Sequence, residues 1–138
     1  MNLMIDIETL GTSPESPVIS IGACYFDESG VKQHFYAVLD VKEQIDKSNR
    51  KVDADTIKWW MGQEGAAKKV FREEIGVIYG QHIHDYVSEE DSDYDRIRKM
   101  DRKSNTTILL SFIYFCVGEY KDSETKPWGN GSTFDITI

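Results

Sequence analysis

Residues 3–11 read LMIDIETLG, an apolar run that contains Asp6 and Glu8 and turns away at Gly11. The aliphatic and β-branched residues predict a short buried strand over residues 3–7. Residues i and i+2 of a strand point to the same side, so the two carboxylates would lie side by side, with Cα atoms roughly 7 Å apart. Two like charges so placed repel each other unless a cation lies between them, and Mg²⁺ and Mn²⁺ prefer such oxygen ligands. About one Asp-x-Glu pair is expected by chance in a chain of this size, so the pair alone does not indicate a site. Its place at the end of an apolar strand is what makes it a candidate metal site.

The neighbouring sequence extends this strand into a sheet. Residues 18–26 and 31–40 have the apolar density and alternation of strands, and DESG at residues 27–30 supplies a tight turn between them. Three consecutive strands predict an antiparallel meander. Near the end, KPWGNGSTFDITI at residues 126–138 predicts a short strand, a turn and a new apolar segment.

From Asp53 onwards the hydrophobic period changes from that of strands to that of helices. DADTIKWWMGQ at residues 53–63 predicts a helix with Asp53 or Asp55 as its N-cap. Residues 65–80 predict a second helix. Residues 106–120 predict a third, which is apolar almost all round and therefore buried, although its composition also allows a strand.

The composition indicates a single globular domain over residues 1–138. Of the 138 residues, 40% are hydrophobic, which is enough to bury a core. The chain has neither an apolar stretch long enough to span a membrane nor the pattern of a secretory signal, so we expect the protein to be located in the cytoplasm. The net charge of −8 argues against a surface that coats nucleic acid, but not against a site that concentrates carboxylates to hold cations.

Cys24 and Cys116 are interpreted as buried free thiols. The charged residues 88–105 are interpreted as a solvated loop or an exposed helix.

Two motifs resemble those of the DEDD superfamily of 3′–5′ exonucleases. MIDIETLGT at residues 4–12 is similar to the first motif of that superfamily, and NGSTFD at residues 130–135 is similar to its second, Asn-x-x-x-(Phe/Tyr)-Asp. The segments SPVISIGACYFD, TIKWWMGQ and PWGNGSTFD further resemble the phage and prophage branch, which contains exonuclease A and exodeoxyribonuclease VIII.

The resemblance implies an α/β, ribonuclease H-like fold, in which a mixed sheet begins with a meander and is flanked by helices. It also implies two Mg²⁺ or Mn²⁺ ions and a single-stranded nucleic-acid 3′ end as the partner. The metal ligands that it implies are Asp6, Glu8 and Asp135. The residues that it places against the substrate are Thr9, Leu10, Asn130 and Phe134. Leu10 would pack on the terminal base, and for Phe134 a place in the core beside the site is an equal alternative.

The third motif of the superfamily carries a fourth acid and a histidine that acts as general base, and only three residues follow Asp135. We therefore expect a C-terminally incomplete domain whose turnover lies at least about 10³-fold below that of a complete relative. His82 and His84 are interpreted as exposed polar residues rather than as a replacement base. His34 is interpreted as a surface residue.

Three hypotheses for the function compete, and we adopt the first for the lineage of the chain, with its turnover left open. The chain is an impaired exonuclease, or a remnant that binds a metal or a 3′ end without cutting, or an assembly module. In the last case an apolar C-terminal face would drive self-association, and Trp59 and Trp60 would be either part of that face or ordinary core. Both DNA and RNA stay open as substrates.

Overall fold

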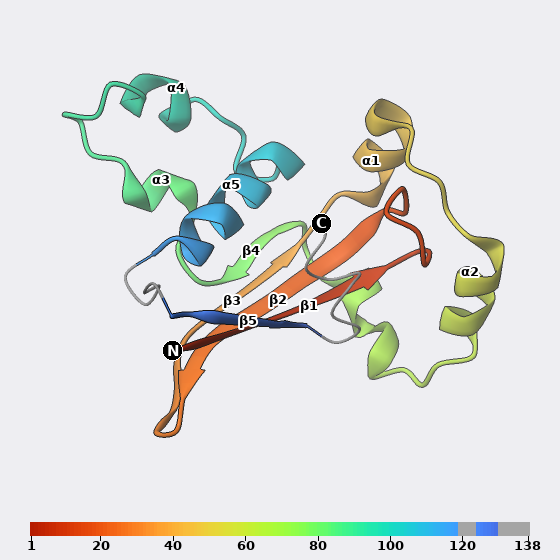
Figure 1. Cartoon of the computed structure of the whole chain (residues 1–138). Coiled ribbons are helices and arrows are strands. Elements are labelled where there is room, and N and C mark those ends of the chain that lie inside the picture. Colours follow the sequence, from red (N-terminus) through yellow and green to blue (C-terminus); the bar gives the residue numbers. More distant parts are fainter. Residues whose placement is uncertain (119–123, 130–138) are drawn as a thin grey trace.

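A five-stranded mixed sheet forms the centre of the protein (Figure 1). The computed structural model describes residues 1–118 and 124–129. The strands lie in the order β4-β3-β2-β1-β5; β1 and β5 pair in parallel, and the other neighbours are antiparallel. Their bounds are β1 (Asn2–Thr9), β2 (Val18–Asp27), β3 (Gly30–Val38), β4 (Gly76–Tyr79) and β5 (Lys126–Gly129). The predicted meander is confirmed as β1 to β3, and the short strand predicted from residue 126 is β5.

Helices connect the strands and cover the sheet. Their bounds are α1 (Val41–Ser48), α2 (Ala54–Met61), the 3₁₀ helix η1 (Ala67–Arg72), α3 (Ile83–Tyr86), α4 (Tyr94–Arg98) and α5 (Asn105–Cys116). As predicted, Asp53 caps α2, because its carboxylate accepts a hydrogen bond from the backbone N–H of Asp55. Ser104 caps α5 in the same way, and the helical alternative for this segment is confirmed. Figure 1 shows α3, α4 and α5 grouped together, away from α2.

Side chains alternate between the two faces of the sheet, as the period of a strand requires. Leu3, Ile5 and Ile7 of β1 pack with Tyr25 of β2 and Phe35 of β3 in a core that α5 covers. Phe115 of α5 lies against both aromatic rings, with ring centroids 5.2 Å from Tyr25 and 5.5 Å from Phe35. The even-numbered residues of β1, among them Asp6 and Glu8, therefore face the other side of the sheet.

Two expectations for the middle of the chain are wrong. The helix predicted for residues 65–80 is instead the short η1 followed by β4. Gly76 and Gly80 have φ angles of 142° and 101°, which a right-handed helix excludes, and Val77 and Tyr79 between them pair with β3. The sequence analysis also missed α1, which Asp40 caps with its carboxylate.

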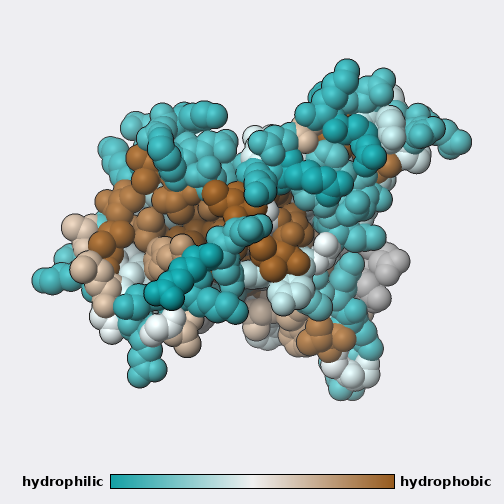
Figure 2. Space-filling model, turned by 180° about the vertical axis from the view of Figure 1, so that it is seen from behind, coloured by the Kyte–Doolittle hydropathy of each residue, from teal (hydrophilic) through white to brown (hydrophobic). Residues whose placement is uncertain are grey.

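The helix α5 is buried on one face and not all round, so the expectation of a wholly buried helix is wrong. Ile108 and Phe115 are buried, whereas Leu109 and Ile113 are 40% and 52% exposed. The exposed side chains border an apolar groove of about 520 Å³ that α1 and β1 also line. Figure 2 shows hydrophobic side chains gathered across the middle of one side of the molecule. Self-association through an apolar face stays a prediction.

The remaining expectations concern isolated features. Cys24 and Cys116 form no disulfide, and both are half-buried rather than fully buried. The charged residues 88–105 contain the short helix α4, whose Ile97 is buried. In the described part of the chain, no helix has the length and apolar character needed to cross a membrane.

Candidate active site

The strand β1 brings Asp6 and Glu8 together on the face of the sheet opposite α5. Its Ile5 and Ile7 pack against the core on the α5 side, so the alternation of the strand points both acids the other way. Asp6 pairs in register with Gly22 of β2, and the glycine places no side chain beside the carboxylate. The side chain of Asp6 is exposed, and partial desolvation by the surrounding protein raises its pKa from its ordinary value. A partly desolvated carboxylate next to a second one is typical of a functional site.

A cavity of about 350 Å³ lies over this acid pair. Its other lining residues are Ser20, Gly22, Tyr36, Ala66, Ala67, Lys69, Val70 and Glu73. The hydroxyl of Tyr36 donates a hydrogen bond to a carboxylate oxygen of Glu73 at 2.5 Å. Burial, and then this carboxylate, raise the pKa of Tyr36 to about 12, so the phenol stays protonated at neutral pH. The cavity therefore combines three carboxylates with one lysine. The sequence analysis did not predict Tyr36, Lys69 or Glu73 as site residues.

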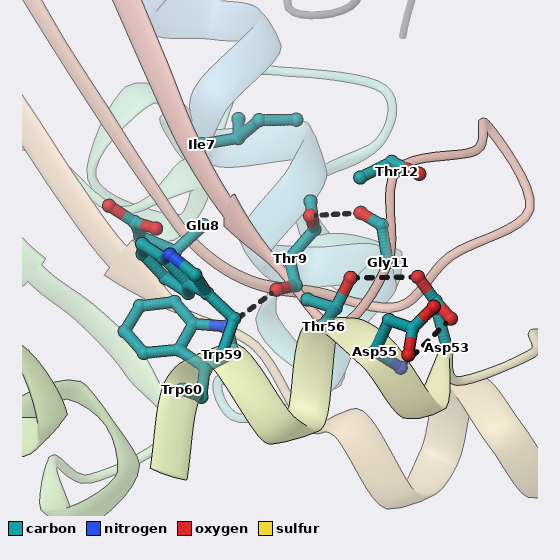
Figure 3. Close-up of a pocket in the computed structure, with 10 residues that line it drawn as sticks. All are labelled: Ile7, Glu8, Thr9, Gly11, Thr12, Asp53, Asp55, Thr56, Trp59 and Trp60. Atoms are coloured by element: carbon teal, nitrogen blue, oxygen red, sulfur yellow. Dashed lines mark hydrogen bonds between the residues drawn. The ribbon is translucent and has the colours of Figure 1, made fainter. Parts of the chain in front are cut away.

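A second cavity, of about 440 Å³, shares Glu8 with the first, and Figure 3 shows the residues that line it. Its other lining residues are Ile7, Thr9, Gly11, Thr12, Asp53, Asp55, Thr56, Trp59 and Trp60. Trp60 is buried, and its indole N–H donates to the backbone carbonyl of Thr9 at 2.9 Å. Trp59 is 57% exposed and stands edge-on to Trp60, with ring centroids 5.0 Å apart. Trp60 is thus core, whereas Trp59 forms an aromatic wall of the cavity beside Glu8.

The turn after β1 is fixed by close packing. A Cβ added at Gly11 would lie 2.1 Å from Oγ of Ser16, so a side chain there would displace the turn. The N–H of Leu10 donates to the carbonyl of Pro17 at 3.0 Å, and the Leu10 side chain is 7% exposed in the apolar cluster under α2. Of the two residues in this turn that the resemblance places against the substrate, Thr9 lines the cavity and Leu10 does not.

The other predicted site residues, Asn130, Phe134 and Asp135, lie outside the described residues, and their roles stay predictions. Within residues 1–118 and 124–129, no group of three His, Cys, Asp or Glu side chains could hold a metal ion. The described part of the site therefore supplies a pair of carboxylates, Asp6 and Glu8.

The histidines His82 and His84 lie far from this pair. They are 6% and 4% exposed, so their interpretation as exposed residues is wrong. Their Nδ1 atoms are 2.7 Å apart, and their Nε2 atoms lie 3.3 Å and 3.1 Å from the carbonyls of Arg102 and Met100. Burial lowers the pKa of both rings. They belong to α3 and its cap, which pack on α5 across the sheet from the acids, so they are structural residues. His34 is exposed, as expected.

The strand order, the parallel β1–β5 pair and the flanking helices define an α/β fold, which is consistent with the expected ribonuclease H-like class. The family model of the Rv2179c-like 3′–5′ exoribonuclease domain matches residues 1–138, and the chain belongs to this family. The match confirms a 3′–5′ exonuclease family, and its description names an exoribonuclease rather than the phage branch. Comparisons with curated proteins and with solved structures found no match.

Proposed function

We propose that this chain is a divalent-cation-dependent 3′–5′ exoribonuclease that removes nucleotides from single-stranded RNA. The family supports the reaction class and the polarity. The observation that carries the proposal is the position of Asp6 and Glu8 on one face of β1, where both acids line the smaller cavity and Glu8 also lines the larger one. One cavity has a lysine and the other has an exposed tryptophan, so a phosphate and a base could be held on either side of the acids.

The acid pair fits a hard divalent cation by its chemistry. Both donors are carboxylates, the ligands that Mg²⁺ and Mn²⁺ favour. Asp6 makes no ion pair with any Lys or Arg of the described ranges, so its charge is available to a cation. Asp6 and Glu8 would hold the ion, with Asp135 as the proposed third ligand. When bound, such ions activate a water molecule and stabilise the leaving 3′ oxygen.

The chain itself would orient the 3′ end. Lys69 lines the same cavity as the acids and can neutralise a phosphate of the substrate. Thr9 lines the adjoining cavity, where its hydroxyl already donates to the carbonyl of Gly11 at 2.5 Å and can accept a further hydrogen bond from a ribose hydroxyl. The face of Trp59 is available for stacking on the terminal base.

A time course with a 5′-labelled oligoribonucleotide and Mn²⁺ tests the proposal. We expect a ladder of products that shorten from the 3′ end and disappear with EDTA. Because the motifs also resemble the phage branch, a DNA strand of the same sequence runs in parallel, and slower cleavage of DNA is expected. Internal cuts, or binding of RNA without any cleavage, would contradict the proposal; the second result would favour a non-catalytic 3′-end binding protein.

Replacing Trp59 with alanine should weaken substrate binding. Stacking of one base on an aromatic side chain contributes about 1–3 kcal/mol, so we expect KM to rise by about 5- to 150-fold while kcat changes little. Met61→Ala is the matched control, because Met61 is 73% exposed on the same helix and does not line the cavity. An equal rise of KM in both variants would indicate damage to α2 rather than loss of a stacking group.

A further inference from the structure

An aromatic trio, His34, Tyr36 and Tyr79, lies on the same face of the sheet as the acid pair. The ring of Tyr79 lies near both of the others, with its centroid 5.5 Å from that of His34 and 6.5 Å from that of Tyr36. Tyr79 is 57% exposed on the edge strand β4, although it is a large aromatic residue. Neither Tyr79 nor His34 lines the two cavities at the acids, so the trio is a separate surface that Tyr36 joins to them.

The strand register aligns this trio with the acids. Asp6 pairs with Gly22, Gly22 pairs with Tyr36, and Tyr36 pairs with Tyr79, so these residues form one row across four strands. Neighbouring strands are about 4.8 Å apart, which places Tyr79 roughly 14 Å from Asp6 along the row. Gly22 has no side chain, and the sheet between Asp6 and Tyr36 forms the floor of the smaller cavity. An extended ligand bound at the acids can therefore continue along the row to Tyr79.

A β-bulge turns Tyr79 towards this face. Tyr36 pairs with Tyr79 but Ala37 pairs with Val77, so Ile78 is an extra residue in β4. Without it, the alternation of the strand would point Tyr79 to the same side as Val77, which packs against the α5-side core. Bulges re-aim side chains and are common next to binding sites.

We propose that the aromatic trio binds bases of single-stranded RNA upstream of the nucleotide that is removed. This inference rests on the proposed function and extends it to substrate length. The acid pair then lies between two aromatic surfaces, with Trp59 at the terminal base and Tyr79 at an upstream base. Stacking on aromatic rings accepts any base, but it requires unpaired bases, so the trio favours single strands of several nucleotides over dinucleotides and duplexes.

The test compares oligoadenylates of two and six nucleotides with Mn²⁺. Tyr79→Ala should raise KM for the longer substrate by about 5- to 150-fold, leave kcat unchanged, and leave both parameters for the dinucleotide unchanged. Tyr79→Phe keeps the ring and should restore the KM of the unmodified protein. Equal effects on both substrates, or no effect on either, would overturn the proposal.

Two control variants sharpen the result. Tyr114→Ala removes a tyrosine that is 39% exposed on α5, across the sheet from the trio. It should leave KM and kcat unchanged for both oligoadenylates. Trp128→Ala removes an exposed aromatic from β5, at the opposite edge of the sheet. A length-dependent rise of KM in Trp128→Ala but not in Tyr79→Ala would mean that the upstream part of the RNA runs towards β5 rather than towards β4. That result would overturn the proposal.

A failure of the proposed function is distinguishable from a failure of this inference. If the unmodified protein cleaves neither oligoadenylate, the proposed reaction is wrong, and fluorescence anisotropy with the labelled six-nucleotide strand then decides the inference. A Kd raised in Tyr79→Ala and restored in Tyr79→Phe would support base binding by the trio. Equal Kd values for all three proteins, or no binding to the unmodified protein, would overturn it.

Discussion

Asp6→Asn should lower the rate of RNA cleavage by at least about 10³-fold. The substitution keeps the shape of the side chain but removes the charge that would hold the cation beside Glu8. Cation stabilisation of the reacting phosphate is worth several kcal/mol, and each 1.36 kcal/mol is tenfold in rate. The measurement is kcat/KM on a 5′-labelled oligoribonucleotide with Mn²⁺, and Glu8→Gln should behave in the same way.

Asp95→Asn is the matched control for this prediction. Asp95 is an exposed aspartate of α4 that lines neither cavity at the acid pair, so its loss should leave the rate unchanged. Thermal unfolding of each variant checks that the fold is retained. Cleavage by Asp6→Asn at the rate of the unmodified protein would show that the acid pair is not the catalytic site.

Phe35→Ala should cost about 3–5 kcal/mol of the free energy of unfolding. Phe35 is 1% exposed, and its ring centroid lies 5.6 Å from that of Phe112 and 5.5 Å from that of Phe115. The truncation would leave a cavity between β3 and α5, at the centre of the larger core cluster. Denaturant unfolding monitored by circular dichroism measures the loss.

Val31→Ala provides the comparison on the same strand. Val31 is 63% exposed at the start of β3, so its truncation should change stability by no more than about 0.5 kcal/mol. A similar loss in both variants would mean that β3 is sensitive to any substitution. The described packing of Phe35 would then not explain its effect.

The central part of the fold could be predicted from local sequence patterns. The alternation of residues 3–8 places Asp6 and Glu8 on one face, and the turn signal at residues 27–30 joins β2 to β3, because these patterns depend on near neighbours. The N-cap of α2 at Asp53 is a similarly local signal.

The parts that could not be predicted depend on distant contacts. The bulge at Ile78 and the pairing of Tyr36 with Tyr79 form only when β4 meets β3, and nothing near residue 78 indicates this. The hydrogen bond from Tyr36 to Glu73 joins residues 37 positions apart. Adjacent tryptophans in a helical pattern do not show which one is buried; the hydrogen bond to Thr9 selects Trp60 and leaves Trp59 in the cavity wall.

The central claim is that Asp6 and Glu8 hold a divalent cation in the smaller cavity, which shares Glu8 with the larger one. Calorimetric titration of the protein with Mn²⁺ alone tests this most directly, with Asp6→Asn and Asp95→Asn measured in parallel. The claim predicts saturable binding to the unmodified protein and to Asp95→Asn, and loss of that binding in Asp6→Asn. Equal Mn²⁺ affinity in all three proteins, or no binding to any of them, would contradict it.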